Sequence, residues 1–299
     1  MPAHKILMVE PKNFSSNPQT ALDNFFQHQP VNSDPSKIES AALKEFHSLA
    51  EKLIRDGIEV IIKKQEDHLL TPDALFPNNW FSTHPDGTFI LYPMQAENRR
   101  LERRTYLIDL LKKNYSKLID FTFYENENSF LEGTGSLVLD SANKIAYASL
   151  SKRTDVHVLK EWSEKMRYEL ITFKSSDRNL QIIYHTNVIM CIADEFAIVC
   201  LDAIQNQKEK LKVESRLRET NHKIIEITLD QMQAFCGNCL ELENKSREKF
   251  LVMSDLAFNN YNDVQLNLIS NYCRIIHSDL STIEKYGGGG ARCMMAELY

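Results

Sequence analysis

A structural unit that recurs four times along the chain is the feature that most constrains its fold. In each copy, two strand-like segments joined by a short turn precede an amphipathic helix and a final strand. The predicted hairpins are 80–83 with 88–92, 136–139 with 145–148, 188–192 with 196–200, and 240–242 with 250–253; the helices lie near 101–111, 155–168, 205–218 and 255–270; the last strands are 118–123, 170–173, 223–227 and 273–277. Copies of one ββαβ unit at a regular period predict an α/β fold built as a propeller-like or barrel-like array.

A fifth copy is split between the two ends of the chain. Residues 293–298 are expected to pair with the strand 5–10, while a helix beginning near Ala42 and a strand at 58–62 complete the unit. A polar loop spans 13–35. Pairing the first strand with the last would close the ring and leave no exposed sheet edge. We therefore expect residues 1–299 to form a single domain, and a content of 43% hydrophobic residues supplies its core.

Just upstream of each hairpin, at the same phase of every repeat, stands a polar side chain. These side chains are separated by 53, 53, 53 and 55 residues, and they are Asn79, Glu132, His185, Asn238 and Cys293. Equivalent positions of a closed array lie at one end of its axis, so we expect them to converge on one pocket. Each residue alone has a plain explanation, such as an edge histidine or a solvated glutamate; their common phase is what favours a site.

Cys293 follows the glycine run 287–290, whose backbone can adopt positive φ and let a ligand approach closely. A buried structural cysteine in a flexible tail is the alternative. Together with His185 and Glu132, however, the thiol forms a set typical of nucleophilic catalysis. The thiolate attacks an electrophilic carbon, the imidazole moves protons, and the carboxylate holds the imidazole or the substrate's nitrogens.

Composition excludes several other classes of function. The net charge is −6 with both signs interspersed, which predicts no binding to nucleic acid. The apolar runs are too short to cross a membrane and no signal peptide is evident, so we expect a cytoplasmic protein. The six cysteines are expected to be reduced, and Cys236-x-x-Cys239 lacks a second pair of ligands nearby. We therefore predict neither a metal nor a cofactor.

The glycine-rich cysteine segment, Leu131-Glu-Gly-Thr-Gly135, Ser151-Lys-Arg-Thr154 and the His185 segment resemble the guanidino-group modifying superfamily. This superfamily comprises arginine deiminases, dimethylarginine hydrolases and glycine amidinotransferases. The resemblance implies a five-bladed α/β propeller, the pentein fold, closed by the terminal strands. It further implies that Cys293 is the nucleophile, His185 the general acid and base, Glu132 the substrate-holding carboxylate, and Arg153 a ligand of the substrate's carboxylate.

Departures from the family pattern point to the substrate. Asn79 and Asn187 stand where guanidinium-binding members usually carry aspartates, and Ser136 replaces a further aspartate. A buried guanidinium needs carboxylate partners, because an unpaired buried charge costs several kcal/mol. Amides can instead bind a neutral ureido group. Asn79, Asn187, Arg153, Asn238 and Arg292 are therefore predicted to bind substrate, and the chain is similar to the citrulline-hydrolysing branch of the superfamily.

Three functions remain open at this point. The first is a cysteine hydrolase that converts citrulline to ornithine, ammonia and CO2. The second is a hydrolase of arginine or methylarginine, or an amidinotransferase. The third is a non-catalytic binding protein on the same scaffold, although the retained cysteine, histidine and glutamate speak against it. The expected partner is a small amino-acid substrate, and the resemblance favours a homodimer.

Overall fold

Five three-stranded sheets, one for each predicted repeat, organise the computed structural model, which describes residues 2–30, 34–65 and 70–299. In each sheet the first and middle strands are antiparallel and the third strand runs parallel to the middle one. The sheets are β3 (Phe81–Thr83), β4 (Thr88–Leu91), β5 (Lys117–Asp120); β6 (Val138–Asp140), β7 (Ile145–Ser149), β8 (Glu169–Phe173); β9 (Met190–Ile192), β10 (Phe196–Val199), β11 (Lys223–Glu226); β12 (Leu240–Glu243), β13 (Lys249–Ser254), β14 (Arg274–Ser278); and β15 (Ala296–Leu298), β1 (Lys5–Glu10), β2 (Glu59–Lys64).

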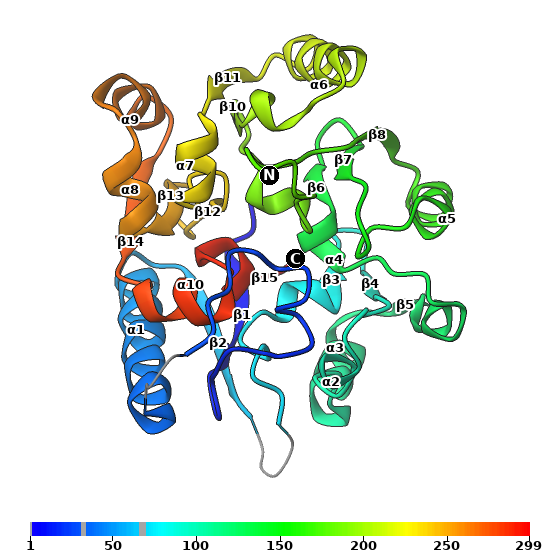
Figure 1. The fold of residues 1–299 in the computed structure, drawn as a ribbon, viewed down its shortest axis with the longest axis vertical. Coiled ribbons are helices and arrows are strands. Elements are labelled where there is room, and N and C mark those ends of the chain that lie inside the picture. Colours follow the sequence, from blue (N-terminus) through cyan, green and yellow to red (C-terminus); the bar gives the residue numbers. More distant parts are fainter. Residues whose placement is uncertain (1, 31–33, 66–69) are drawn as a thin grey trace.

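The sheet that contains both ends of the chain confirms the predicted exchange of strands. Lys5 of β1 pairs with Leu298 of β15, and β2 adds to the other side of β1 in parallel. Neighbouring sheets touch through β15 and β3, β6 and β9, and β9 and β12, while Ala3 bridges to Leu242 of β12. Figure 1 shows the sheets arranged around a common centre, which agrees with the expected α/β propeller.

The helices are α1 (Pro35–Arg55), α2 (Glu97–Arg100), α3 (Thr105–Asn114), α4 (Gly133–Ser136), α5 (Val156–Met166), α6 (Gln207–Glu219), α7 (Leu229–Gln233), α8 (Asp255–Asn260), α9 (Asp263–Ser270) and α10 (Ser281–Gly287). The longer helices α1, α3, α5, α6 and α9 lie on the outside of the sheets, whereas the buried α4 lies near their common centre (Figure 1). In α1, Asp34 caps the first turn by accepting from the Ser36 N–H, and Pro35 occupies the first helical position. A buried apolar stripe that includes Ala42 and Phe46 packs this helix onto the core.

In four of the five repeats the first strand begins later than the sequence predicts, and only β12 begins at the predicted residue, Leu240. Short helical turns precede the other four strands, at Pro77–Asn79, in α4, at Thr186–Val188 and at Ala291–Met294. Apolar residues such as Val188 are buried, but they sit in these turns. Alternating hydrophobicity reports burial and cannot separate a tight turn from the first residues of a strand.

A further strand prediction needs correction. The strand expected at 118–123 ends at Asp120, and Thr122–Glu127 form a 3₁₀ helix, in which the Asp120 side chain accepts from the Thr122 N–H. The loop expected at 13–35 has no helix or strand in its described residues before Pro35, where α1 begins; residues 31–33 lie outside the described residues. Some of its side chains are nevertheless buried. Phe26 packs into a core cluster, and Asn24 donates weakly to the Gly287 and Gly288 carbonyls.

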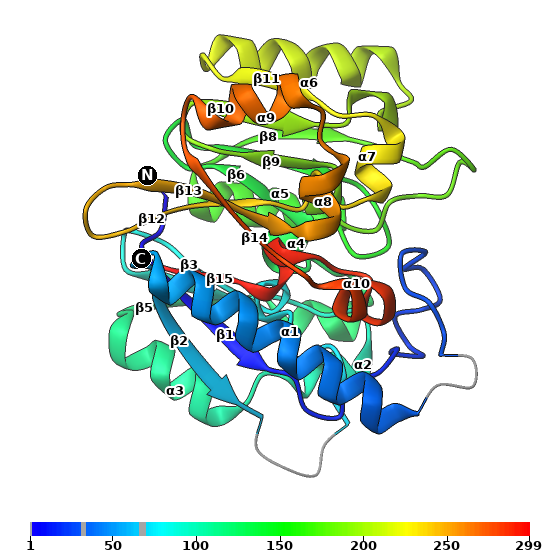
Figure 2. The ribbon, with the colours of Figure 1, turned by 90° about the vertical axis from the view of Figure 1, so that its left-hand side faces the viewer.

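Figure 2 separates the two ends of the propeller axis. The chain termini lie at one end, and α10 with the segment that follows β1 lies at the other. None of the helices in the described ranges is long and apolar enough to traverse a lipid bilayer.

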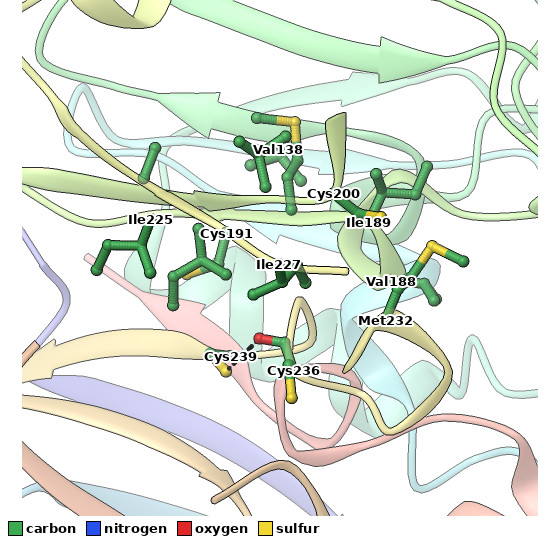
Figure 3. Close-up of a cluster of buried hydrophobic side chains, with 14 of the residues drawn as sticks. Val138, Val188, Ile189, Cys191, Cys200, Ile225, Ile227, Met232, Cys236 and Cys239 are labelled. Atoms are coloured by element: carbon green, nitrogen blue, oxygen red, sulfur yellow. Dashed lines mark hydrogen bonds between the residues drawn. The ribbon is translucent and has the colours of Figure 1, made fainter. Parts of the chain in front are cut away.

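The cysteines other than Cys293 contribute to the apolar interior. All six are buried free thiols. Figure 3 shows four of them (Cys191, Cys200, Cys236 and Cys239) among valine, isoleucine and methionine side chains, with the Cys239 thiol donating to the Cys236 carbonyl at 3.2 Å. Burial raises the pKa of Cys236 to about 12, which makes it a packing residue with little thiolate character.

Candidate active site

The helical turns that replace the first residues of the strands carry the polar side chains of the repeat. Asn79 ends the turn before β3, Glu132 immediately precedes α4, and His185 immediately precedes the turn before β9. Cys293 lies inside the turn before β15. Each turn aims its side chain from the end of a sheet toward the axis, so the equal spacing in sequence becomes proximity in space.

On one side of the site, two amides surround the thiol. Asn238 Nδ2 lies 3.3 Å and Asn187 Nδ2 3.5 Å from Cys293 Sγ, both in the range of weak hydrogen bonds to sulfur. Asn238 Nδ2 also donates to the Asn187 carbonyl at 3.0 Å, which ties the two residues together. The sulfur therefore has amide N–H donors beside it.

On the other side, Glu132 and His185 form a buried pair. Glu132 Oε2 lies 2.8 Å from His185 Nε2. The second carboxylate oxygen accepts from the Gln95 N–H at 3.0 Å, and an Arg153 guanidinium nitrogen lies 3.6 Å from Oε2. A carboxylate on Nε2 fixes the ring's orientation and leaves Nδ1 for contacts elsewhere.

Gly135 has no side chain, which allows the His185 ring and the Asn79 side chain to pack against its backbone. A Cβ on this residue would stand 2.5 Å from Asn79 Nδ2 and 2.7 Å from His185 Nδ1, so only a glycine fits between them. Both side chains therefore lie against the same point of backbone. These contacts explain why residue 135 must be a glycine in this repeat.

A narrow cavity joins the two sides. The space open to the centre of a water molecule is only about 10 Å³, room for roughly one water. Its walls come from several repeats and from the segment after β1: Thr20, Asn24, Asp73, Phe76, Asn79, Arg99, Arg153, Tyr184, His185, Gly287, Gly288, Gly289 and Cys293. Cys293 and His185 thus share one opening, and a ligand larger than water would require the walls to move apart.

Two buried arginines line this cavity. Arg153 bonds to Asp23 and to the Thr20 carbonyl, and its guanidinium lies 4.8 Å from the centre of the Tyr184 ring. Arg99 forms a bidentate pair with Glu102 at 2.9 and 3.0 Å. It also donates to Asn79 Oδ1 at 2.7 Å.

The charges around Glu132 keep it ionised. Burial alone would raise the pKa of this carboxyl group, but Arg153, His185 and Arg99 outweigh burial and hold the pKa at about 2. Burial lowers the pKa of His185, although its hydrogen bond to Glu132 opposes this effect. Near neutral pH the pair is a carboxylate beside a neutral imidazole.

Cys293, in contrast to the ionised Glu132, is uncharged in the absence of substrate. Burial raises the pKa of Cys293 above its ordinary value, while Asn238, Arg292 and Asn187 lower it by smaller amounts. Without substrate the thiol is therefore protonated near neutral pH, and it needs a base or a substrate charge to become a nucleophile.

The structure does not bring Arg292 into this cavity. Its guanidinium donates to the Met295 carbonyl and pairs with Glu297, both at 2.9 Å. It lines a different cavity, of about 100 Å³, which Pro2 and Tyr299 also line at the end where the chain termini lie. Its influence on Cys293 is electrostatic.

The sequence patterns missed Asp73, which belongs to the cavity wall. Its Oδ2 accepts from Asn17 and Thr20 at 2.7 and 3.0 Å, whereas its buried Oδ1 has no hydrogen-bond partner within the described residues. Asp73 lies six residues before Asn79 and outside the repeat phase, so periodicity could not identify it. Thr20, Asn24 and Tyr184 were missed for the same reason.

Metal binding finds no support in these side chains. Within the described ranges, no cluster of three or more histidine, cysteine, aspartate or glutamate residues could hold an ion. The Cys236 and Cys239 thiols face the apolar interior, so this motif is structural here.

Solved structures share this fold over nearly the whole chain. ArgZ, an arginine dihydrolase from the ornithine-ammonia cycle in cyanobacteria, superposes with a TM-score of 0.77 at 15% identity, covering 98% of this chain and 40% of that one. AgrE, a cysteine mutant of which was solved with L-arginine, gives 0.75 at 16% identity, covering 99% of this chain and 40% of that one. DDAH from Pseudomonas aeruginosa, solved with citrulline, gives 0.69 at 15% identity, with both chains covered completely.

This chain therefore spans about 40% of the full-length ArgZ and AgrE chains, but 97% of the isolated N-terminal domain of ArgZ. A comparison with curated proteins finds no match. The model of the family described as N,N dimethylarginine dimethylhydrolase, eukaryotic, matches residues 10–299. This match confirms the guanidino-modifying superfamily that the motifs suggested, and the chain belongs to the N,N dimethylarginine dimethylhydrolase family.

Proposed function

We propose that the protein is a cysteine-dependent hydrolase that cleaves a C–N bond of a ureido or guanidino amino acid, with citrulline as the first candidate. The observation that carries the proposal is the shared cavity of Cys293 and His185. A thiol flanked by amide donors lies on one side of it, and an imidazole oriented by an ionised carboxylate lies on the other. The family's own name describes hydrolysis of a methylated arginine.

In the proposed reaction, Cys293 Sγ gives its proton to His185, which is neutral at rest, and attacks the central carbon of the ureido group. The N–H groups of Asn187 and Asn238 stabilise the charge that develops beside the sulfur. His185 donates a proton to the departing amine, leaving a thioester bound to Cys293. His185 then takes a proton from the attacking water, the C–S bond breaks, and the carbamate released by hydrolysis loses CO2.

Glu132 and the two arginines have separate proposed roles. Glu132 stabilises the imidazolium that forms on His185 and fixes its ring. Arg153 is the proposed ligand of the substrate's carboxylate, and Arg99 supports Asn79 from behind. The unpartnered Oδ1 of Asp73 is available to accept from an N–H group of the substrate.

The amides favour a neutral reacting group. The polar groups on Cys293 Sγ are the side chains of Asn187 and Asn238, and Asn79 offers a further amide to the same cavity. A guanidinium would need carboxylates to offset the cost of burying its charge, whereas a ureido oxygen accepts from amide N–H groups.

Arginine is the second candidate, and a specific observation supports it. ArgZ is an arginine dihydrolase, and its N-terminal domain has been solved with substrate in a cysteine-to-serine mutant and with a covalently bound reaction intermediate. Glu132 and Asp73 could serve as the carboxylates that a guanidinium needs. On this alternative the same thiol would release ammonia twice, first from arginine and then from the ureido intermediate.

The test is a panel of L-citrulline, L-arginine, methylarginines and their shorter analogues, with ammonia, amine and ornithine products quantified together. The proposal predicts ammonia and ornithine from citrulline. Rapid ammonia release from arginine with none from citrulline would overturn the preference for a ureido group. Turnover of neither class by well-folded protein would overturn the proposal itself.

We further propose that residues 1–299 act as one domain. Assembly as a homodimer and a cytoplasmic location stay predictions. Sedimentation at several protein concentrations would measure the oligomeric state.

A further inference from the structure

Two buried polar side chains beside the Cys293 loop carry oxygen atoms that have no hydrogen-bond partner in the described part of the chain. One is Asn238, whose Oδ1 is unpaired although the residue is only 1% exposed. The other is Glu284 on α10, which is 3% exposed with both carboxyl oxygens unpaired. Buried polar atoms are rarely left without partners, because each such atom costs about 1–3 kcal/mol. The proposed chemistry does not use Glu284.

The orientation of the Asn238 amide follows from its neighbours. Its Nδ2 donates to the Asn187 carbonyl, which can only accept, so the NH2 group must lie on that side. The same nitrogen contacts Cys293 Sγ. Oδ1 consequently faces the opposite way, toward Gly290 of the glycine run.

The Glu284 carboxyl group also lies beside Gly290. A Cβ on Gly290 would stand 2.9 Å from Asn238 Oδ1 and 3.4 Å from Glu284 Oε1. The two oxygens therefore both lie beside the same point of the glycine run, on the sides that a Cβ of residue 290 would contact. Two acceptors cannot bond to each other, but a protonated carboxyl group is a donor.

The surroundings of Glu284 favour its protonated form. Burial raises its pKa to about 8; a weak contact with the Ser254 hydroxyl, which falls outside ordinary hydrogen-bond geometry, lowers it, while Glu45, Asp279 and Asp255 add to the rise. Glu45 comes from α1 and caps α10 by accepting from the Thr282 and Ile283 N–H groups. Acidic groups thus face Glu284 from more than one element, and they disfavour its ionisation.

We propose that protonated Glu284 donates a hydrogen bond, directly or through one water, to Asn238 Oδ1 and so holds the Asn238 NH2 group against Cys293 Sγ. Glu284 is then a positioning residue that supports the thiolate through Asn238. The inference rests on the proposed role of Cys293 as the nucleophile. It also gives a pH dependence, because ionisation of Glu284 removes the donor and places a negative charge near the thiolate.

The experiment follows alkylation of Cys293 by iodoacetamide from pH 6 to 10 without substrate, with the modified peptide quantified by mass spectrometry. Glu284→Gln keeps a donor and cannot ionise, whereas Glu284→Leu keeps the approximate volume and has no donor. Lys285→Ala, at the exposed neighbouring position, is the matched control. Asn238→Ala, alone and combined with Glu284→Leu, tests whether Glu284 acts through Asn238.

We expect Glu284→Leu to slow alkylation about tenfold near pH 8, the effect of raising a thiol pKa by about one unit. Glu284→Gln should restore the rate and exceed the wild-type rate above about pH 8, where wild-type Glu284 ionises. In the Asn238→Ala background, Glu284→Leu should have no further effect.

The proposal is overturned if folded Glu284→Leu and Glu284→Gln both follow the wild-type curve, or if Glu284→Leu slows the reaction equally without Asn238. Should Glu284→Leu not fold, the Glu284→Gln curve decides alone, and identity with wild type up to pH 10 is the contradicting result. Failure of the proposed function is a separate outcome, because the alkylation rate is measured without any substrate.

Discussion

The two sides of the cavity are built from equivalent turns of the same repeat, yet they are prepared for reaction in different ways. On the imidazole side, Glu132 is already ionised and is surrounded by Arg153 and His185 before any ligand arrives. On the thiol side, Cys293 is protonated at rest, and its nearest polar groups are neutral amides. The fold thus organises fixed charge on one side and leaves the Cys293 thiol uncharged on the other.

This difference separates orientation from activation. The buried ion pairs of Glu132 and Arg153 fix geometry at all times, since breaking one would leave an uncompensated buried charge. The thiolate, in contrast, forms only when its proton has somewhere to go. A thiol that stays protonated near neutral pH until substrate enters reacts only slowly with oxidants and alkylating agents, and faster as the pH rises. Substitutions on the two sides should therefore have distinct consequences.

The largest effect is expected on the thiol side, from Cys293→Ser. A serine hydroxyl is far harder to ionise in the same amide surroundings, so turnover should fall by at least about 10⁴-fold. The measurement is ammonia release from citrulline and arginine. Cys273→Ala is the control, because this buried cysteine lies in a core cluster away from the cavity. Residual activity near the wild-type level would assign the reaction to another group.

On the imidazole side, Glu132→Gln keeps the shape of the side chain and removes its charge. His185 would lose the carboxylate that stabilises its protonated form, and kcat should fall by about 10²–10³-fold. Steady-state kinetics over a range of pH check this, with the exposed Glu127→Gln as control. A change confined to KM would show that Glu132 holds substrate and has no part in proton transfer.

Asn187→Asp places a negative charge next to Cys293 and so tests whether neutral amides there select a ureido group. A carboxylate 3.5 Å from Sγ would raise the thiol pKa and favour a cationic substrate. We expect the ratio of kcat/KM for citrulline to that for arginine to fall about tenfold. Asn271→Asp, at an exposed position, provides the control. An unchanged ratio would contradict the argument that the amides select a ureido group.

The smallest effect concerns the stability of the charged side. The pKa of Glu132 is depressed to about 2 in the folded protein, so its ionised form stabilises the fold above the unfolded pKa near 4.5 and loses that contribution as pH falls toward 2. The lowered pKa of His185 acts in the same direction below about pH 6.5. Urea unfolding at pH 7 and pH 3 should show wild type losing more stability than Glu132→Gln, by about 1–2 kcal/mol. Equal losses of unfolding free energy in the two proteins would show that the charge of Glu132 contributes little to stability.

Sequence periodicity predicted the architecture well, because a repeated ββαβ pattern allows few arrangements. It also predicted that Asn79, Glu132, His185, Asn238 and Cys293 lie at one end of the axis, since equal spacing in a cyclic array implies a common end, and the contacts among these side chains agree with that placement. What it could not predict are contacts made by residues outside that phase. Asp73 and Thr20 reach the cavity from segments without a regular period.

Arg292 was predicted from its sequence position to bind substrate, but it does not line the cavity. It adjoins Cys293 in sequence, but consecutive residues of a turn point in different directions, and its guanidinium faces Glu297. The strand starts were misplaced for a related reason. A tight helical turn buries its apolar residues as thoroughly as a strand does, so hydrophobicity alone cannot distinguish them.

The most direct test of a covalent Cys293 mechanism is to trap the intermediate. The enzyme is mixed with citrulline, and in parallel with arginine, quenched in acid during turnover, and analysed by intact mass and peptide mapping. We expect a substrate-derived adduct on the peptide that contains Cys293, and no such adduct in Cys293→Ser. An adduct carried by a different peptide during productive turnover would contradict this mechanism.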